Sequence, residues 1–178
     1  MTHLKQALLC LFLTGMTGTA LAQTEEFPYS WSGNWKGELQ WFKGNAREPQ
    51  RVPMELRIAA TDTAGWYTWQ LIYGAAAEDN RPYLLMSKDT ATGHWVIDER
   101  NGIILDQFIR GGRFCGVFTV MGNTILNSYT REGDTMTVEF YSYSAKPIAT
   151  TGEGTDDSPK VDSYRIGGFQ KAVLHRSH

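Results

Sequence analysis

Apolar and polar residues alternate along most of this chain with a period of two. Between residues 52 and 60 every even position is apolar, whereas Tyr67, Trp69, Leu71 and Tyr73 share the odd positions of the next segment. Residues two apart lie on the same face of a β-strand, so each segment has one apolar and one polar face. Beyond residue 23, the spacing of three and four that marks an amphipathic helix is nowhere sustained over a dozen positions. The pattern predicts an all-β protein of half-buried antiparallel strands.

Turn-forming residues separate these segments at short and regular intervals, as at Asn101-Gly102, Gly111-Gly112 and Gly122-Asn123. Short strands at such spacing are typical of a β-sandwich or an up-and-down β-barrel. We expect about ten strands, near residues 34–42, 52–60, 65–73, 82–88, 93–99, 103–109, 113–121, 124–131, 134–144 and 161–175.

The first 22 residues have the features of a secretory leader. Lys5 precedes an apolar run from Ala7 to Ala20, and Ala20 and Ala22 are the small residues that a signal peptidase reads. We therefore expect residues 1–22 to be cleaved. Residues 23–178 should form a single domain that is secreted to a periplasm. No later apolar run approaches the length of roughly 20 residues that a membrane-spanning helix needs, so the sequence predicts no membrane span.

Charge argues against a nucleic-acid-binding protein. The chain has 17 Lys and Arg residues and 19 Asp and Glu residues, which gives a formal net charge of −2, and it contains no long run of either sign. Proteins that bind nucleic acid usually carry a basic stripe or patch, and this chain has none in its sequence.

Two segments depart from the alternation. Residues 113–121 are apolar on both faces, which predicts that a chain terminus or a partner subunit, as in a homodimer, covers the outer face. Residues 146–160 contain no aromatic residue and are rich in Thr, Gly, Pro and Asp. We expect this segment to be a long mobile loop, either a plain surface loop or a lid over a barrel mouth.

The start of the first strand, Gly33-Asn34-Trp35-Lys36-Gly37, resembles the G-x-W signature of the calycin superfamily, which includes lipocalins, fatty-acid-binding proteins and nitrobindin-like haem barrels. The last strand ends in Ala-Val-Leu-His-Arg and so places Arg176 near the end of the chain. The resemblance implies an antiparallel up-and-down barrel of about ten strands in which Trp35 closes one end. It also implies that Arg176, with Lys171 as the other candidate, packs across the Trp35 ring.

A barrel of this kind suggests a non-catalytic binding protein for a small hydrophobic molecule. An aromatic lining inside the barrel would hold an apolar or planar ligand by burial and stacking. The residues expected to line such a cavity are Trp41, Met54, Leu56, Tyr67, Trp69, Tyr73 and Phe140. Three alternatives stay open: a filled barrel that serves as a scaffold, an envelope protein that binds other proteins through its outer face, and an enzyme.

No cofactor, metal site or catalytic residue is expected. Haem is the one cofactor that the resemblance brings in, through a His on the last strand, but the alternation places His175 on the outer face. A bulge at Gly167-Gly168 would reverse that assignment. The His175-x-x-His178 pair lies at the chain end and lacks the three fixed ligands of a catalytic zinc site. Neither a nucleophile elbow nor a phosphate-binding loop is present.

Overall fold

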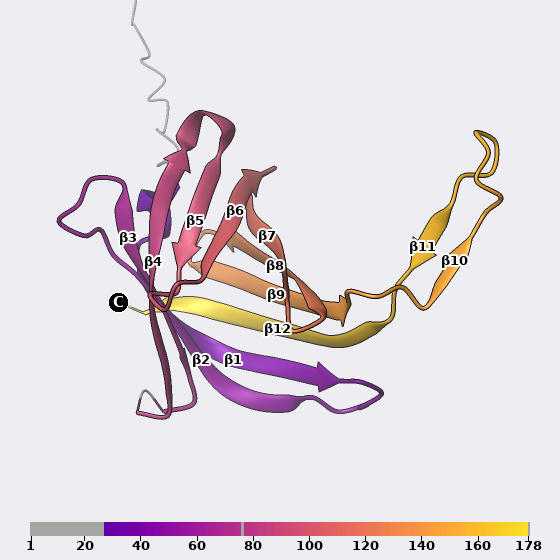
Figure 1. Ribbon diagram of the computed structural model, residues 1–178. Coiled ribbons are helices and arrows are strands. Elements are labelled where there is room, and N and C mark those ends of the chain that lie inside the picture. Colours follow the sequence, from indigo (N-terminus) through magenta and orange to yellow (C-terminus); the bar gives the residue numbers. More distant parts are fainter. Residues whose placement is uncertain (1–26, 76, 178) are drawn as a thin grey trace, which may run out of the picture.

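A computed structural model describes residues 27–75 and 77–177 of the chain (Figure 1). The predicted leader, residues 1–22, lies outside the described residues. Two short 3-10 helices, η1 (Tyr29–Trp31) and η2 (Thr90–Thr92), accompany the strands. The strands are β1 (Gly33–Lys43), β2 (Gln50–Ile58), β3 (Trp66–Tyr73), β4 (Asp79–Asp89), β5 (His94–Asp98), β6 (Ile104–Arg110), β7 (Arg113–Val120), β8 (Asn123–Glu132), β9 (Thr135–Ser144), β10 (Ala149–Thr151), β11 (Val161–Ser163) and β12 (Ile166–Ser177).

Ten of these strands form a closed antiparallel barrel, which confirms the predicted fold class. The order around the barrel is β1-β12-β9-β8-β7-β6-β5-β4-β3-β2, so neighbours in sequence pair except where β12 enters between β9 and β1. Closure leaves neither β1 nor β12 as a terminal edge of the sheet, because each pairs on both sides. Among the described residues, no helix is long and apolar enough to cross a membrane.

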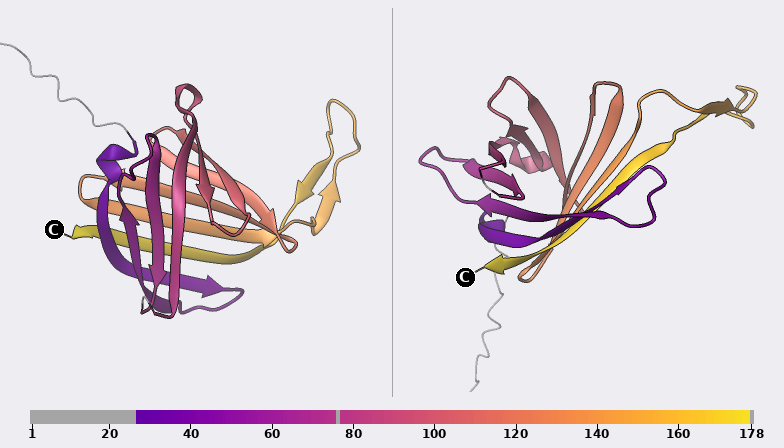
Figure 2. Two further views of the ribbon diagram at one scale, coloured as in Figure 1. Left: turned by 60° about the vertical axis from the view of Figure 1, so that its left-hand side comes forward. Right: turned by 90° about the horizontal axis from the view of Figure 1, so that it is seen from below.

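The remaining two strands correct one prediction from the sequence. The segment expected as a single strand at 161–175 is divided into β11 and β12, and β11 pairs with β10 in a separate two-stranded sheet. This hairpin leaves the barrel between β9 and β12 and projects away from it (Figures 1 and 2). The segment 146–160, expected as a loop, therefore contains β10 and the tip of the hairpin. It does not lie over the barrel as a lid would.

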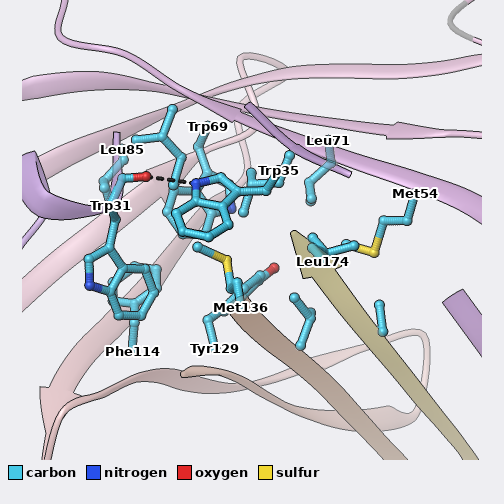
Figure 3. Close-up of a cluster of buried hydrophobic side chains, with 14 of the residues drawn as sticks. Trp31, Trp35, Met54, Trp69, Leu71, Leu85, Phe114, Tyr129, Met136 and Leu174 are labelled. Carbon is cyan, nitrogen blue, oxygen red and sulfur yellow. Dashed lines mark hydrogen bonds between the residues drawn. The ribbon is translucent and has the colours of Figure 1, made fainter. Parts of the chain in front are cut away.

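Large side chains fill the centre of the barrel (Figure 3). They come from alternate positions of the strands, which face the interior of the barrel. Side chains with an exposure of 2% or less include Trp35, Met54, Leu56, Ile58, Trp69, Leu85, Phe114, Tyr129, Met136, Val138 and Leu174. The Trp69 ring lies 5.1 Å from the Phe114 ring and 5.0 Å from the Tyr129 ring, centroid to centroid. The middle of the barrel is thus a packed aromatic core.

The segment around η1 closes one end of the barrel. Trp35 is fully buried, and its indole N–H donates a hydrogen bond of 2.8 Å to the Trp31 carbonyl (Figure 3). The Arg176 guanidinium carbon lies 4.4 Å from the centroid of the Trp35 ring, which is the contact that the resemblance implied. Arg176 also donates to the Ser30 carbonyl at 2.9 Å and pairs with Asp134 at 3.1 Å. One arginine therefore ties the last strand to both η1 and the first strand.

Candidate functional site

A cavity at the other end of the barrel is the candidate site, and we call it the mouth pocket. Its volume is about 340 Å³. Inward-facing residues of β1, β2 and β12 form one wall, and β3, β4 and the turn between them form the other. The lining residues are Leu39, Trp41, Val52, Tyr73, Gly74, Glu78, Asp79, Arg81 and Gln170.

Strand register explains why the apolar part of this lining comes together. Leu39 is the register partner of Val52 on β2, and Trp41 is the partner of Gln170 on β12. Side chains two apart on one strand and their partners on the next share a face. The end of β1 therefore brings an aliphatic residue, an indole and an amide to the same side of the pocket.

The rim of the mouth pocket carries paired charges. The Arg81 guanidinium donates two hydrogen bonds of 2.8 Å to the Asp79 carboxylate, and these hold the pKa of that carboxyl below its usual range. The guanidinium carbon also lies 4.8 Å from the centroid of the Tyr73 ring. Lys43 places its ammonium 3.7 Å from the centroid of the Trp41 ring. Together with Glu78, the rim holds two acids and two bases, so it does not select an anion by net charge.

Tyr73 contributes a neutral hydrogen-bonding group to the wall of the pocket. Burial raises the pKa of this phenol to about 12, against a smaller opposing effect of Arg81. The hydroxyl therefore stays protonated at physiological pH and is able to donate as well as accept a hydrogen bond.

The structure distributes the seven predicted lining residues over three places. Trp41 and Tyr73 line the mouth pocket. The core takes Met54, Leu56 and Trp69, with exposures of 2%, 0% and 0%. Phe140 is partly buried against Tyr129, at a ring distance of 5.9 Å, and Tyr67 lines a second cavity at the closed end of the barrel. The predicted residues thus share the inner face of the barrel but do not surround a single cavity.

The cavity beside Tyr67 is larger, about 590 Å³, but the segment that contains Phe27 and η1 fills much of this end of the barrel. The Phe27 ring lies 5.0 Å from Trp31, 5.2 Å from Trp95 and 4.8 Å from Phe114, so it occupies this end of the barrel together with η1. We prefer the mouth pocket because inward-facing side chains from five strands form it.

Neither described histidine is placed to hold a haem inside the barrel. His175 is exposed on β12, out of phase with the buried Ala172 and Leu174, and its Nδ1 lies 3.5 Å from the Thr135 hydroxyl. His94 pairs with Asp106 at 2.7 Å and stacks on Phe108 at a centroid distance of 4.6 Å. The bulge on β12 lies between Ile166 and Gly168 and leaves the register beyond it continuous.

No group of three His, Cys, Asp or Glu residues within the described ranges is close enough together to hold a metal ion. The residue at the end of the predicted H-x-x-H pair, His178, lies outside those ranges. Among the residues that line the mouth pocket, Tyr73 and Gln170 are able to form hydrogen bonds, and Leu39, Trp41 and Val52 offer apolar contact.

Three polar residues on the inner face of the barrel are not among the predicted site residues. Gln170, Gln107 and Asn127 occupy inward positions in otherwise apolar series, and this parity is the signal that would have revealed them. Glu78 and Asp79 lie at the turn between β3 and β4, where acids are common and carry no such signal.

The outer face of β7 is not covered by any part of the described chain. Val117 is 58% exposed and its neighbour on β8, Leu126, is 36% exposed. They border a groove of about 360 Å³ lined by Asp106, Phe108, Arg110, Cys115, Gly116, Val117 and Leu126. The predicted covering by a terminus is therefore absent from residues 27–75 and 77–177.

Comparison with known proteins bears on the fold alone. No protein-family model matches the chain, and no curated protein matches it in sequence. Among solved structures, the chain is similar to a protein of unknown function of the DUF3598 family from Nostoc punctiforme PCC 73102, with a TM-score of 0.57 and 14% sequence identity. The match covers 82% of this chain and 47% of that protein, so the chain spans about half of its length. At this identity the similarity is one of architecture.

Proposed function

We propose that this protein is a secreted, non-catalytic binding protein that holds a small hydrophobic molecule in the mouth pocket. The observation that carries the proposal is the cavity of about 340 Å³ between Trp41 and Tyr73 at the end of an otherwise filled barrel. This volume lies within the range of small-molecule sites, and an indole and a phenol with aliphatic neighbours suit a planar apolar ligand.

Three further features support the proposal. The leader-like residues 1–22 favour export, which a periplasmic binding protein requires. The Trp35–Arg176 contact at the closed end favours a calycin-type barrel, a class that is closed at one end and binds at the other. The charged rim residues Asp79 and Arg81 neutralise each other, which favours binding over acid–base catalysis.

Replacing Trp41 by Ala should weaken the binding of 2-methylnaphthalene, measured by equilibrium dialysis, by roughly tenfold, the equivalent of about 1.4 kcal/mol. The free energy of unfolding should change much less, because Trp41 is half-buried and Lys43 covers one face of its ring. Trp66→Ala makes the same chemical change at an exposed position of β3 and should leave binding unaltered. Equal affinities in the two variants, or no binding by the unmodified protein, would contradict the proposal.

The outer groove on β7 supports protein binding as a second candidate function. An apolar strand face with Val117 at 58% exposure is the kind of surface that interfaces use. If two copies meet there, Val117→Lys should convert a dimer to a monomer in analytical ultracentrifugation. A monomer before the substitution, over the whole accessible concentration range, would reject the homodimer.

A further inference from the structure

The wall of the barrel is incompletely paired between β6 and β7. The ladder that joins these strands holds three register pairs, all next to the turn between them, and it ends at Phe108 and Cys115. Gly116 still lies close to β6, since an added Cβ would be 2.7 Å from the Asp106 carbonyl oxygen, but beyond it the strands diverge (Figure 1). On its other side β7 is paired with β8 along all eight of its residues. Residues 117–120 of β7 therefore have a partner strand on one side only, and we call them the free edge.

The free edge is exposed and largely apolar. Val117 and Val120 are 58% and 42% exposed, and the described part of the chain places no further strand beside them. The groove of about 360 Å³ lies next to this edge, with Phe108 of β6 and Leu126 of β8 among its lining residues. The backbone N–H and C=O groups of an uncovered edge pair readily with another extended segment, and adjacent pockets receive its side chains. The free edge thus offers a place for one more strand.

The β10–β11 hairpin lacks the support that a further strand would give it. Among the described residues, β10 and β11 pair with each other and with no other strand, and all six of their residues are exposed. An isolated two-stranded hairpin is at best marginally stable in water, whereas a third strand stabilises it. One face of the hairpin carries no charged side chain and consists of Ala149, Thr151, Val161 and Ser163. The hairpin is therefore suited to extend a sheet with an apolar outer face.

The charges of the hairpin and of the β6–β7 turn are complementary. The tip of the hairpin, residues 152–160, contains one base and three acids, which are Glu153, Asp156 and Asp157. Arg110 and Arg113 flank the turn, and within the described chain neither they nor the three acids take part in an ion pair. Because β7 begins at this turn and β10 leads into the tip, antiparallel addition of β10 to β7 would point the acids toward the two arginines. Such complementarity favours encounter and fixes the direction of the added strand.

We propose that two copies of this chain exchange their hairpins, so that the β10–β11 hairpin of each copy adds a strand to the free edge of β7 in the other. In a single copy, β9, β8 and β7 separate the base of the hairpin from the free edge, which lies on the β6 side of β7. The hairpin also projects away from its own barrel (Figure 2). Exchange of an identical element between copies is a low-cost route to a dimer. The inference rests on protein binding through the outer face of β7, the second candidate function, and it identifies the partner and the segment that binds.

Sedimentation velocity of the unmodified protein and of two variants tests the exchange. The unmodified protein should sediment as a dimer. Val117→Lys places a charge beside the free edge and its groove, so it should raise the dissociation constant of the dimer at least tenfold. The matched control is Val173→Lys, because Val173 is 41% exposed on β12, which is paired along both sides. The control should keep the dissociation constant of the unmodified protein.

A hairpin-less variant removes the other half of the contact. In this variant Asn-Gly replaces residues 145–164, so that a two-residue turn joins β9 to β12 close to the register pair of Tyr143 with Ile166. It should sediment as a monomer, and circular dichroism should show that it keeps the strands of the barrel. The hairpin-less variant retains the free edge, and Val117→Lys retains the hairpin. An equimolar mixture should therefore contain a dimer at concentrations where each variant alone is monomeric.

The outcomes separate this inference from the function on which it rests. If Val117→Lys dissociates the dimer and the hairpin-less variant stays dimeric, the exchange is wrong and binding through β7 stands. A mixture of the two variants that stays monomeric also overturns the exchange. If the unmodified protein is a monomer at every accessible concentration, or if Val117→Lys leaves its dimer intact, both the exchange and the homodimer through β7 are rejected. Val117→Lys changes one exposed side chain, so this part of the test does not depend on whether the hairpin-less variant folds.

Discussion

Replacing Trp69 by Ala should lower the free energy of unfolding by about 4 kcal/mol, as large aromatic truncations in packed cores do. Trp69 is 0% exposed and its ring packs against Phe114 and Tyr129 at 5.1 and 5.0 Å. Truncation to Ala removes these contacts and leaves a cavity that the tightly packed neighbouring side chains are unable to fill. In a domain of this size, the loss corresponds to a fall in Tm of roughly 10 °C.

Urea denaturation of the variant measures this loss, with Trp66→Ala as the control. Trp66 lies on the same strand but is 39% exposed, so its truncation should change the free energy of unfolding by less than about 1 kcal/mol. A loss below roughly 1.5 kcal/mol for Trp69→Ala would indicate that the ring borders a cavity. Trp69 would then belong to the ligand site, as the sequence suggested, and the mouth pocket would extend deeper into the barrel.

Local sequence predicts the strands of this barrel because the alternation of apolar and polar residues is visible within each strand. The alternation in β2 and β3 and the turns at Asn101-Gly102 and Gly122-Asn123 are readable without knowledge of the partner strands. The β10–β11 hairpin is not predictable from local alternation. All six of its strand residues are exposed, so no apolar face marks it.

Depth along the barrel explains why the lining residues are only partly predictable. A period of two indicates which face of the strand a residue occupies. The residue's position along the barrel axis depends on the tilt of the strand and on its register with the two neighbouring strands. Trp41 and Trp69 both face inward, yet one reaches the mouth pocket and the other the core. The inward positions of Gln107 and Asn127 are predictable from the alternation alone. Leu105 and Ile109 lie two residues from Gln107, Tyr129 lies two residues from Asn127, and all three face the core.

Replacing Gly37 by Ala should destabilise the barrel by about 3 kcal/mol, near the upper end for overpacking by a single methyl group. Gly37 is the register partner of Leu174 where β1 meets β12, and an added Cβ would lie 2.1 Å from the Val173 carbonyl oxygen. The obstacle is backbone rather than a flexible side chain, so relief requires the two strands to separate at the seam that closes the barrel.

Thermal unfolding and native-state hydrogen exchange together test this effect. The Tm of Gly37→Ala should fall, and the amides paired between β1 and β12 should lose protection more than those between β7 and β8, because the strain acts at the closing seam. Gly44→Asn is the matched control. Gly44 lies just beyond β1 with a φ of +53° and nothing within 4 Å of an added Cβ, and Asn tolerates this left-handed conformation. Unchanged protection at the seam in Gly37→Ala would mean that the strands adjust without opening, and that closure of the barrel does not depend on the close approach at Gly37.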